Sequence, residues 1–213
     1  VAVFDGVAGV EPQTETVWKQ ADKYRVPRMC FVNKMDRLGA DFYAALASIK
    51  DRLGANIAVL QLPIGAEGHY KGVIDLITME ALVWLDEDLG AKWEVREIPE
   101  NLKAEAEDYR HQLIDVLSTF DETILEKYVG DEEITVDDLH RAVRAGTIAS
   151  EIVPVLNGTA FKNKGVQPLL DAIVLYMPSP IDLPPVTGLS LKGHEEVERK
   201  PSDDEKFAAL AFK

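Results

Sequence analysis

The sequence has a single cysteine, Cys30, among its 213 residues. One thiol excludes an internal disulfide framework, and its place inside an apolar run fits a reducing compartment. Long hydrophobic runs are also missing, because no stretch approaches the roughly 18 consecutive apolar residues that a membrane-spanning helix needs. We therefore expect a cytoplasmic protein that has no membrane partner.

The start of the chain, VAVFDGVAGV, lacks the basic residues of a secretory signal peptide and opens within an apolar, strand-like run. The end of the chain, FAALAFK (residues 207–213), also has the pattern of a strand and stops abruptly. A strand needs partners, so we expect the chain to be a fragment of a longer protein.

Basic residues are scarce, with 23 Lys and Arg against 37 Asp and Glu and a formal net charge of −14. Most of the imbalance falls in residues 86–138, which hold 18 acidic and 5 basic residues and so carry −13. Such a segment is not expected to bind a phosphate backbone directly. It fits either a solvated surface or a surface that meets a basic protein partner.

Metal-binding and phosphate-binding patterns are missing as well. The four histidines, His69, His111, His140 and His194, have no paired ligand spacing, so no metal site is predicted. No G-x-x-x-x-G-K-[ST] loop occurs in the chain. We therefore expect nothing in this chain to cradle the α and β phosphates of a nucleotide.

The pattern that is present begins as an open α/β sheet. An apolar strand at residues 1–5 is followed by a helix that starts at Pro12, a favoured first helical position. The run 26–32 is too uniformly apolar to be a half-exposed strand, as is typical of a central parallel strand. A second helix follows residues 33–36 and ends at Gly54.

The alternation of strand and helix then breaks. Three strands with short connections are predicted at 57–62, 72–77 and 80–85, and helices follow them. The last of these helices is predicted to open with Thr135 and Asp138 as a capping-box variant and to end at Gly146. From residue 151 the strand–turn–helix pattern returns. The predicted fold class is therefore α/β, a doubly wound sheet interrupted by an inserted acidic α+β subdomain. The α/β domain covers 1–54 and 150–178, the insertion covers 55–149, and 179–206 is a linker.

Polar turns follow two strands of the predicted sheet, the sequence NKMD after MCFV and the sequence GTAF after IVPVL. Ligands of doubly wound sheets bind at the carboxyl ends of the strands. If the two strands are neighbours, the turns form two walls of one pocket. The alternative is that each is an ordinary polar turn.

The side chains of these turns suit a guanine base. Ionised Asp36 accepts two hydrogen bonds, which the N1–H and the exocyclic amine of guanine supply and adenine does not. Asn33 offers donors to the O6 and N7 acceptors, and the stem of Lys34 can lie along a ring face. The amide N–H of Ala160 can donate to O6, and Thr159 can brace the pocket. The predicted chemistry is selection of guanine.

The stretch VAVFDGVAGVEPQTETVWKQADKYRVPRMCFVNKMDRLGADF resembles the G domain of translational GTPases, and within that family the bacterial factors that act in translocation. NGTAFKNKGVQPLLDAIVLYMPSPIDLPP resembles the family's second guanine-contacting loop and the helix that leads out of the domain. The resemblance covers essentially the whole chain. It implies a partial P-loop-GTPase-type sheet, with 207–213 as the first strand of a following β-barrel domain.

The resemblance also implies site residues. Asn33, Lys34 and Asp36 match the family's guanine-reading motif, and Thr159 and Ala160 match its second loop. Phe161 stands where the family usually has a leucine, so the apolar contact on the base edge is expected to be kept but bulkier. No catalytic residue is expected in this chain, because the family's phosphate loop, Mg²⁺-binding threonine and water-positioning histidine precede the position that matches Val1. This chain alone is therefore predicted to hydrolyse no GTP.

For the intact protein, the resemblance implies a GTPase that binds GTP and GDP with Mg²⁺, the Mg²⁺ ligands lying outside this chain. Its hydrolysis of GTP would drive tRNA and mRNA through the ribosome. This chain would act on those RNAs only indirectly. The family's inserted subdomain meets the stalk protein of the large ribosomal subunit, and the acidic insertion at 55–149 would have that partner.

Two other functions remain open at this point. One is a sister translational GTPase, such as a ribosome-protection or peptide-release factor, although members without a large insertion fit poorly. The other is a non-catalytic interaction module whose acidic insertion binds a ribosomal protein and whose nucleotide loops no longer act. Binding of a basic partner to 55–149 without dependence on guanine nucleotides would favour the second.

Overall fold

The structure is a computed structural model that describes residues 1–85, 90–190 and 195–209. It divides into two compact units, Val1–Met177 and Pro178–Lys213, and each is described by itself. In the described part of the chain, no helix combines the length and the apolar character that crossing a membrane requires.

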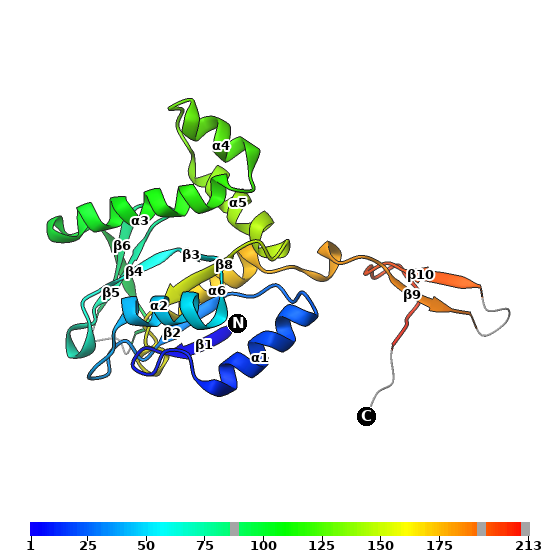
Figure 1. The fold of residues 1–213 in the computed structure, drawn as a ribbon, viewed down its shortest axis with the longest axis horizontal. Helices are drawn as coiled ribbons and strands as arrows, with labels where there is room; N and C mark the ends of the chain where they lie inside the picture. The colour runs from blue at the N-terminus through cyan, green and yellow to red at the C-terminus, as the bar shows by residue number, and fades with distance from the viewer. Residues whose placement is uncertain (86–89, 191–194, 210–213) are drawn as a thin grey trace. The chain divides into compact units, whose positions relative to one another are not determined.

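The first unit is built on a four-stranded parallel sheet in the order β1-β2-β8-β3 (Figure 1). Every residue of β3 and β8 is buried, and so are the first three residues of β2, which explains why all of these residues except Asn157 are apolar. The four strands are β1 (Ala2–Asp5), β2 (Cys30–Asn33), β3 (Ile57–Val59) and β8 (Val153–Asn157).

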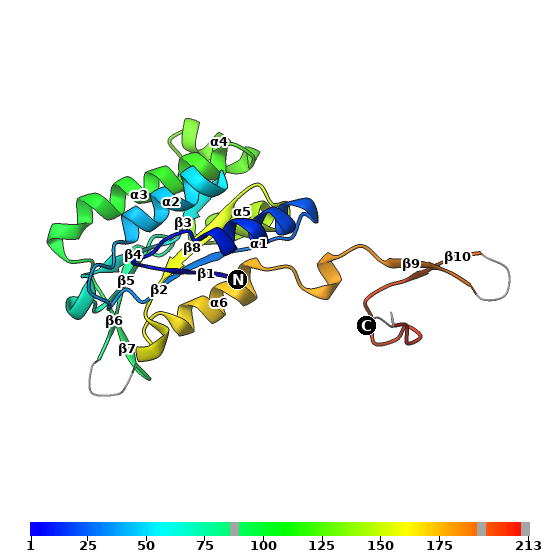
Figure 2. The same ribbon diagram turned by 60° about the horizontal axis from the view of Figure 1, so that its bottom comes forward.

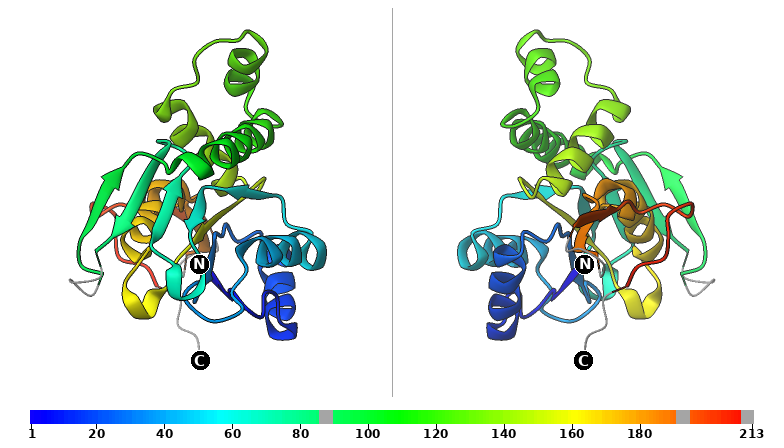
Figure 3. Two further views of the ribbon diagram at one scale, coloured as in Figure 1. Left: turned by 90° about the vertical axis from the view of Figure 1, so that its left-hand side faces the viewer. Right: turned by 90° about the vertical axis from the view of Figure 1, so that its right-hand side faces the viewer.

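Helices cover both faces of this sheet, with α1 and α2 on one side and α6 on the other (Figure 3). Their bounds are Pro12–Lys23 for α1, Phe42–Leu53 for α2 and Val166–Tyr176 for α6. Pro12 stands at the start of α1, and Gly54 ends α2 in the left-handed conformation with φ of 61°, as the sequence predicts. The doubly wound α/β layout is therefore confirmed for this part of the chain.

The insertion forms a second, antiparallel sheet in the order β4-β5-β6-β7. The single strand predicted at 57–62 is wrong, because the run divides at Leu60. The N–H of Leu60 donates to the carbonyl of Val155 in the first sheet, while its carbonyl accepts from the N–H of Leu76 beside the second. The antiparallel strands are β4 (Gln61–Ile64), β5 (Gly72–Asp75), β6 (Glu80–Trp84) and β7 (Trp93–Arg96).

This division places 57–59 in the α/β sheet, so the inserted sheet begins later than the boundary predicted at residue 55. The sequence could not show the change of sheet, because Leu60 lies within one continuous buried run, with Val59 and Gln61 both buried on either side of it. Strand β7 was also missed. Its sequence WEVR does alternate apolar and charged side chains, but the run is only four residues long and all four residues are exposed, so no buried face marks it as a strand.

Three helices complete the insertion, α3 (Glu100–Ser118), α4 (Glu122–Val129) and α5 (Val136–Ile148). The predicted capping box of α5 is present, with the Asp138 N–H donating to Thr135 Oγ1 at 3.2 Å and the Thr135 N–H donating to Asp138 Oδ2 at 3.0 Å. The predicted end at Gly146 is wrong, since α5 runs on to Ile148. Gly146 serves packing instead: a Cβ there would meet the Phe120 ring and lie 2.9 Å from Cγ1 of Ile152.

The second unit contains more order than the linker predicted at 179–206. A short 3₁₀ helix spans Pro180–Asp182, and β9 (Val186–Leu189) pairs antiparallel with β10 (Glu196–Arg199). Of the strand predicted at 207–213, residues 207–209 are described and are irregular, and 210–213 lie outside the described residues. His194 also lies outside them.

Substitution Gly146→Ala tests the packing role of this glycine. Alanine is the better helix former by about 1 kcal/mol, yet its methyl group would collide with Phe120 and Ile152. We expect the free energy of unfolding to fall by about 1–3 kcal/mol in urea denaturation. Gly68→Ala is the matched control, because nothing lies within 4 Å of its added Cβ. Stabilisation by Gly146→Ala would show that the glycine is not required by packing.

Candidate functional site

The two polar turns lie side by side because the strands before them are neighbours. In the parallel pairing of β2 with β8, Val32 is aligned with Asn157, so both strands end at the same edge of the sheet (Figure 2). The Gly158 N–H donates to the carbonyl of Val32 at 2.9 Å, and the Met35 N–H donates to the carbonyl of Gly158 at 3.2 Å. The backbone alone thus joins the first turn (residues 33–36) to the second turn (residues 158–165).

Side chains join the two turns as well. The Ala160 N–H donates to Oδ1 of Asn33 at 2.9 Å, and the Thr159 hydroxyl donates to Oδ1 of Asp36 at 2.5 Å. Thr159 is fully buried, with 1% of its surface exposed, whereas Asp36 is half-buried. Four of the six residues that the sequence singled out are therefore in direct contact across the two turns.

One contact differs from the expected arrangement. The Ala160 N–H, expected to donate to O6 of a base, instead donates to the side-chain oxygen of Asn33. With its oxygen used in this way, Asn33 offers a ligand the two N–H donors of its amide group. Those donors suit the O6 and N7 acceptors of a guanine ring.

Lys34 pairs with a residue that the sequence reasoning did not select. Its backbone is left-handed, with φ of 64°, and its ammonium group lies 2.6 Å from Oδ2 of Asp5 at the end of β1. This bond is the main reason that the pKa of Asp5 is lowered. Asp5 is aligned with Asn33 in the β1–β2 pairing, so its place at the end of a parallel strand was the signal that could have identified it.

Phe161 lies at the rim, with 98% of its surface exposed. It belongs to a short 3₁₀ helix, Ala160–Lys162, which Asn163 ends in the left-handed conformation with φ of 55°. Gly158, just before this helix, has no room for a side chain, because a Cβ there would lie 2.6 Å from both the Phe31 ring and the carbonyl oxygen of Lys164. The second turn is therefore tightly packed beneath an exposed phenyl group.

Lys162 is the second residue that the sequence reasoning left out of the site. Its ammonium group lies 3.1 Å from Oδ2 of Asp36. Burial alone would raise the pKa of Asp36, but the hydrogen bonds from Thr159 and Lys162 outweigh it, and the pKa is lowered overall. Asp36 is therefore an ionised, acceptor-only group at neutral pH.

Metal ligands do not gather in the described part of the chain. Among those residues, no group of three or more His, Cys, Asp and Glu side chains is arranged to hold a metal ion. What the two turns offer a ligand is a carboxylate acceptor, amide donors and an exposed aromatic ring. This set is complementary to a polar planar molecule that has donors on one edge and acceptors on the next.

The bond from Ala160 to Asn33 can be tested by Asn33→Ala. Because the substitution removes the acceptor, we expect the Ala160 amide to exchange with solvent several-fold faster when followed by NMR. Asn33→Asp keeps an acceptor oxygen and should retain the protection. Equal exchange rates in the unmodified chain and Asn33→Ala would contradict the contact between the turns.

Comparison with known proteins gives three findings. Residues 1–179 match the family described as the elongation factor Tu GTP binding domain. Elongation factor G of Orientia tsutsugamushi, from strain Ikeda and from strain Boryong, is 57% identical over all 213 residues. The chain spans 30% of the length of these curated relatives. A crystal structure of a protein from Thermus thermophilus is also similar, with 29% sequence identity and a TM-score of 0.76. The match covers 88% of this chain and 28% of the Thermus chain.

Proposed function

This chain belongs to the elongation factor Tu GTP-binding domain family, and from that premise we propose that it is the guanine-reading part of a ribosomal translocation GTPase of the elongation factor G type. The observation that carries the proposal is the contact between the two turns. The Thr159 hydroxyl donates a hydrogen bond to Asp36, and the Ala160 N–H donates one to Asn33. These bonds join two turns that lie far apart in the sequence, and the Asp36 carboxylate and the Asn33 amide stand in one site between them.

The site reads the Watson–Crick edge of guanine. Asp36 accepts from N1–H and from the exocyclic amine, while the amide donors of Asn33 serve O6 and N7. Adenine would leave Asp36 without its two donors and would set its own amine against those of Asn33. A mismatch of buried polar groups can discriminate by about 10⁴-fold or more. The ligands are therefore GTP and GDP, and the exposed ring of Phe161 adds apolar contact at the edge of the base.

In the whole protein, hydrolysis of GTP drives tRNA and mRNA through the ribosome in the cytoplasm. The chain of 213 residues has no G-x-x-x-x-G-K-[ST] loop, and phosphoryl transfer depends mostly on positioning and electrostatics by the groups around the phosphates. Mg²⁺ acts with those phosphates, and its ligands are assigned to no residue of this chain. The 213-residue chain by itself therefore binds the base and does not turn over GTP.

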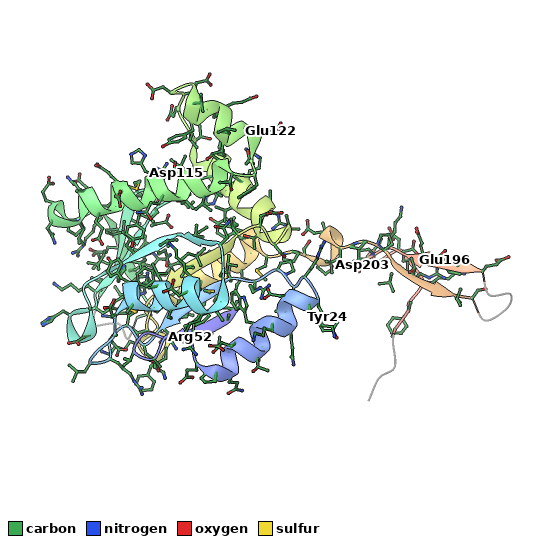
Figure 4. The ribbon with its side chains drawn as sticks, in the orientation of Figure 1. Tyr24, Arg52, Asp115, Glu122, Glu196 and Asp203 are labelled. Carbon is green, nitrogen blue, oxygen red and sulfur yellow. The ribbon has the colours of Figure 1, made fainter. Side chains whose placement is uncertain are left out.

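The acidic insertion supplies the contact with the ribosome. Exposed carboxylates lie along its helices, among them Asp115 on α3 and Glu122 on α4 (Figure 4). Glu126 on α4 is exposed as well. Apolar side chains of α4 are exposed beside them, with 78% exposure for Val129 and 44% for Leu125. A surface of this composition fits a positively charged protein patch with an apolar centre, and we assign it to the stalk protein of the large ribosomal subunit.

Titration with nucleosides tests the guanine site without requiring phosphate contacts. We expect guanosine at millimolar concentration to shift the backbone amides of residues 33–36 together with those of 158–161, followed by NMR. Inosine, which lacks the exocyclic amine, should bind more weakly, and adenosine should leave both turns unchanged. The same sample should release no phosphate from GTP. Equal shifts with guanosine and inosine would contradict the two-donor contact at Asp36.

Charge reversal on α4 tests the ribosomal partner. The double substitution Glu122→Lys and Glu126→Lys should slow association with the isolated stalk protein and weaken its dependence on salt, measured by surface plasmon resonance. Glu196→Lys with Glu198→Lys makes the same change of charge on exposed residues of β10, outside the insertion, and should have little effect. Equal effects of the two pairs would mean that net charge, and not the insertion, governs the contact.

A further inference from the structure

Asp36 is held by two side chains of the second turn, one on each carboxylate oxygen. Thr159 donates to Oδ1 at 2.5 Å, and the Lys162 ammonium lies 3.1 Å from Oδ2. The Asp36 side chain is 19% exposed and that of Lys162 is 50% exposed. The lysine therefore reaches from solvent onto a carboxylate that is largely buried.

Both groups come from one short and well-defined piece of backbone. The Lys162 N–H donates to the carbonyl of Thr159 at 3.0 Å, and the Asn163 N–H donates to the carbonyl of Ala160 at 3.0 Å. Thr159 is paired in turn with Lys164 through an antiparallel bridge. The backbones of Thr159 and Lys162 are thus held together by hydrogen bonds that do not involve Asp36.

The number of lone pairs is compatible with a ligand at the same carboxylate. An ionised carboxylate has about four acceptor positions, two on each oxygen. Thr159 uses one position on Oδ1 and Lys162 uses one on Oδ2, so these two side chains do not fill either oxygen. Two parallel donors, such as those on the N1 and amine edge of guanine, need one position on each oxygen.

Rotation of the carboxylate about its last torsion angle would misalign those two positions. This torsion is broad and roughly two-fold in aspartate, so the side chain does not hold its own plane. A single contact at Oδ1 leaves the group free to pivot, whereas contacts at both oxygens define the plane. Lys34 does not share this role, since its ammonium group is paired with Asp5.

We propose that Lys162 is a positioning residue of the guanine site, which holds the Asp36 carboxylate in the plane that accepts both edge donors of guanine and so sets the preference for guanosine over inosine. The inference rests on the proposed function, because it concerns how the same site tells bases apart. Lys162 acts through Asp36 and needs no contact with the base.

Substitution Lys162→Met tests this role, because methionine keeps much of the apolar stem and removes the charge. The first measurement is the pKa of Asp36, from the pH dependence of its carboxyl carbon in NMR. Since Lys162 favours the ionised form, its loss should raise that pKa. Lys162→Arg should keep the pKa low. Lys19→Met removes one charge from an exposed position on α1 and should leave the pKa of Asp36 unchanged.

The second measurement is the ratio of guanosine to inosine affinity, from NMR titration of the same variants. A half-exposed ion pair contributes about 0.2–1 kcal/mol, so Lys162→Met should reduce the ratio by a factor of about 1.4 to 5. Lys162→Arg should restore it, and Lys19→Met should not change it. A general loss of structure would move all affinities equally and would appear in the far-UV circular dichroism spectrum.

The outcomes separate the inference from the proposed function. If the unmodified chain prefers guanosine and Lys162→Met changes neither the pKa of Asp36 nor the affinity ratio, Lys162 is not a positioning residue and the guanine site stands. If the unmodified chain binds no guanosine, the proposed function and this inference are both overturned. A raised pKa with an unchanged ratio also overturns the inference, because the lysine then affects charge without affecting selection.

Discussion

The parallel pairing of β2 with β8 is the constraint on which the rest of the first unit depends. It aligns Cys30 with Val155 and Val32 with Asn157, although more than a hundred residues separate the two strands. The pairing is made by fully buried residues, so it is stabilised by the apolar core and protected from water. Because parallel strands end at the same edge, this one pairing brings the two polar turns together.

The insertion is anchored to β8, one strand of this pair, by buried polar contacts. The Tyr70 hydroxyl donates to Oδ1 of Asn157 at 3.0 Å, and Nδ2 of Asn157 donates to the carbonyl of Gln61 at 3.2 Å. Asn157 is fully buried and stands directly before the second turn. Leu60 adds backbone bonds to both sheets. The inserted sheet is thus attached within a few residues of the two polar turns.

Much of the fold could be predicted because its signals are local. Pro12, Gly54 and the Thr135–Asp138 capping box mark helix ends through the conformations and hydrogen bonds of adjacent residues, and the structure confirms all three. The change of sheet at Leu60 and the packing of Gly146 could not be predicted, because both depend on partners elsewhere in the chain. A buried run reads the same in either sheet, and a glycine near the end of a helix can either end the helix or make room for a neighbouring ring.

The candidate site also has one part that the sequence predicts and another that depends on the tertiary structure. The sequence by itself determined which residues face the carboxyl edge of the sheet, since the motif NKMD and the motif GTAF follow recognisable buried strands. The tertiary structure alone decided their partners: Ala160 bonds Asn33, Lys34 pairs with Asp5, and Lys162 pairs with Asp36. The physical reason is that secondary structure depends on neighbours within about one helical turn or strand, whereas an ion pair depends on distance in space. Only folding brings Asp36 and Lys162 to within 3.1 Å.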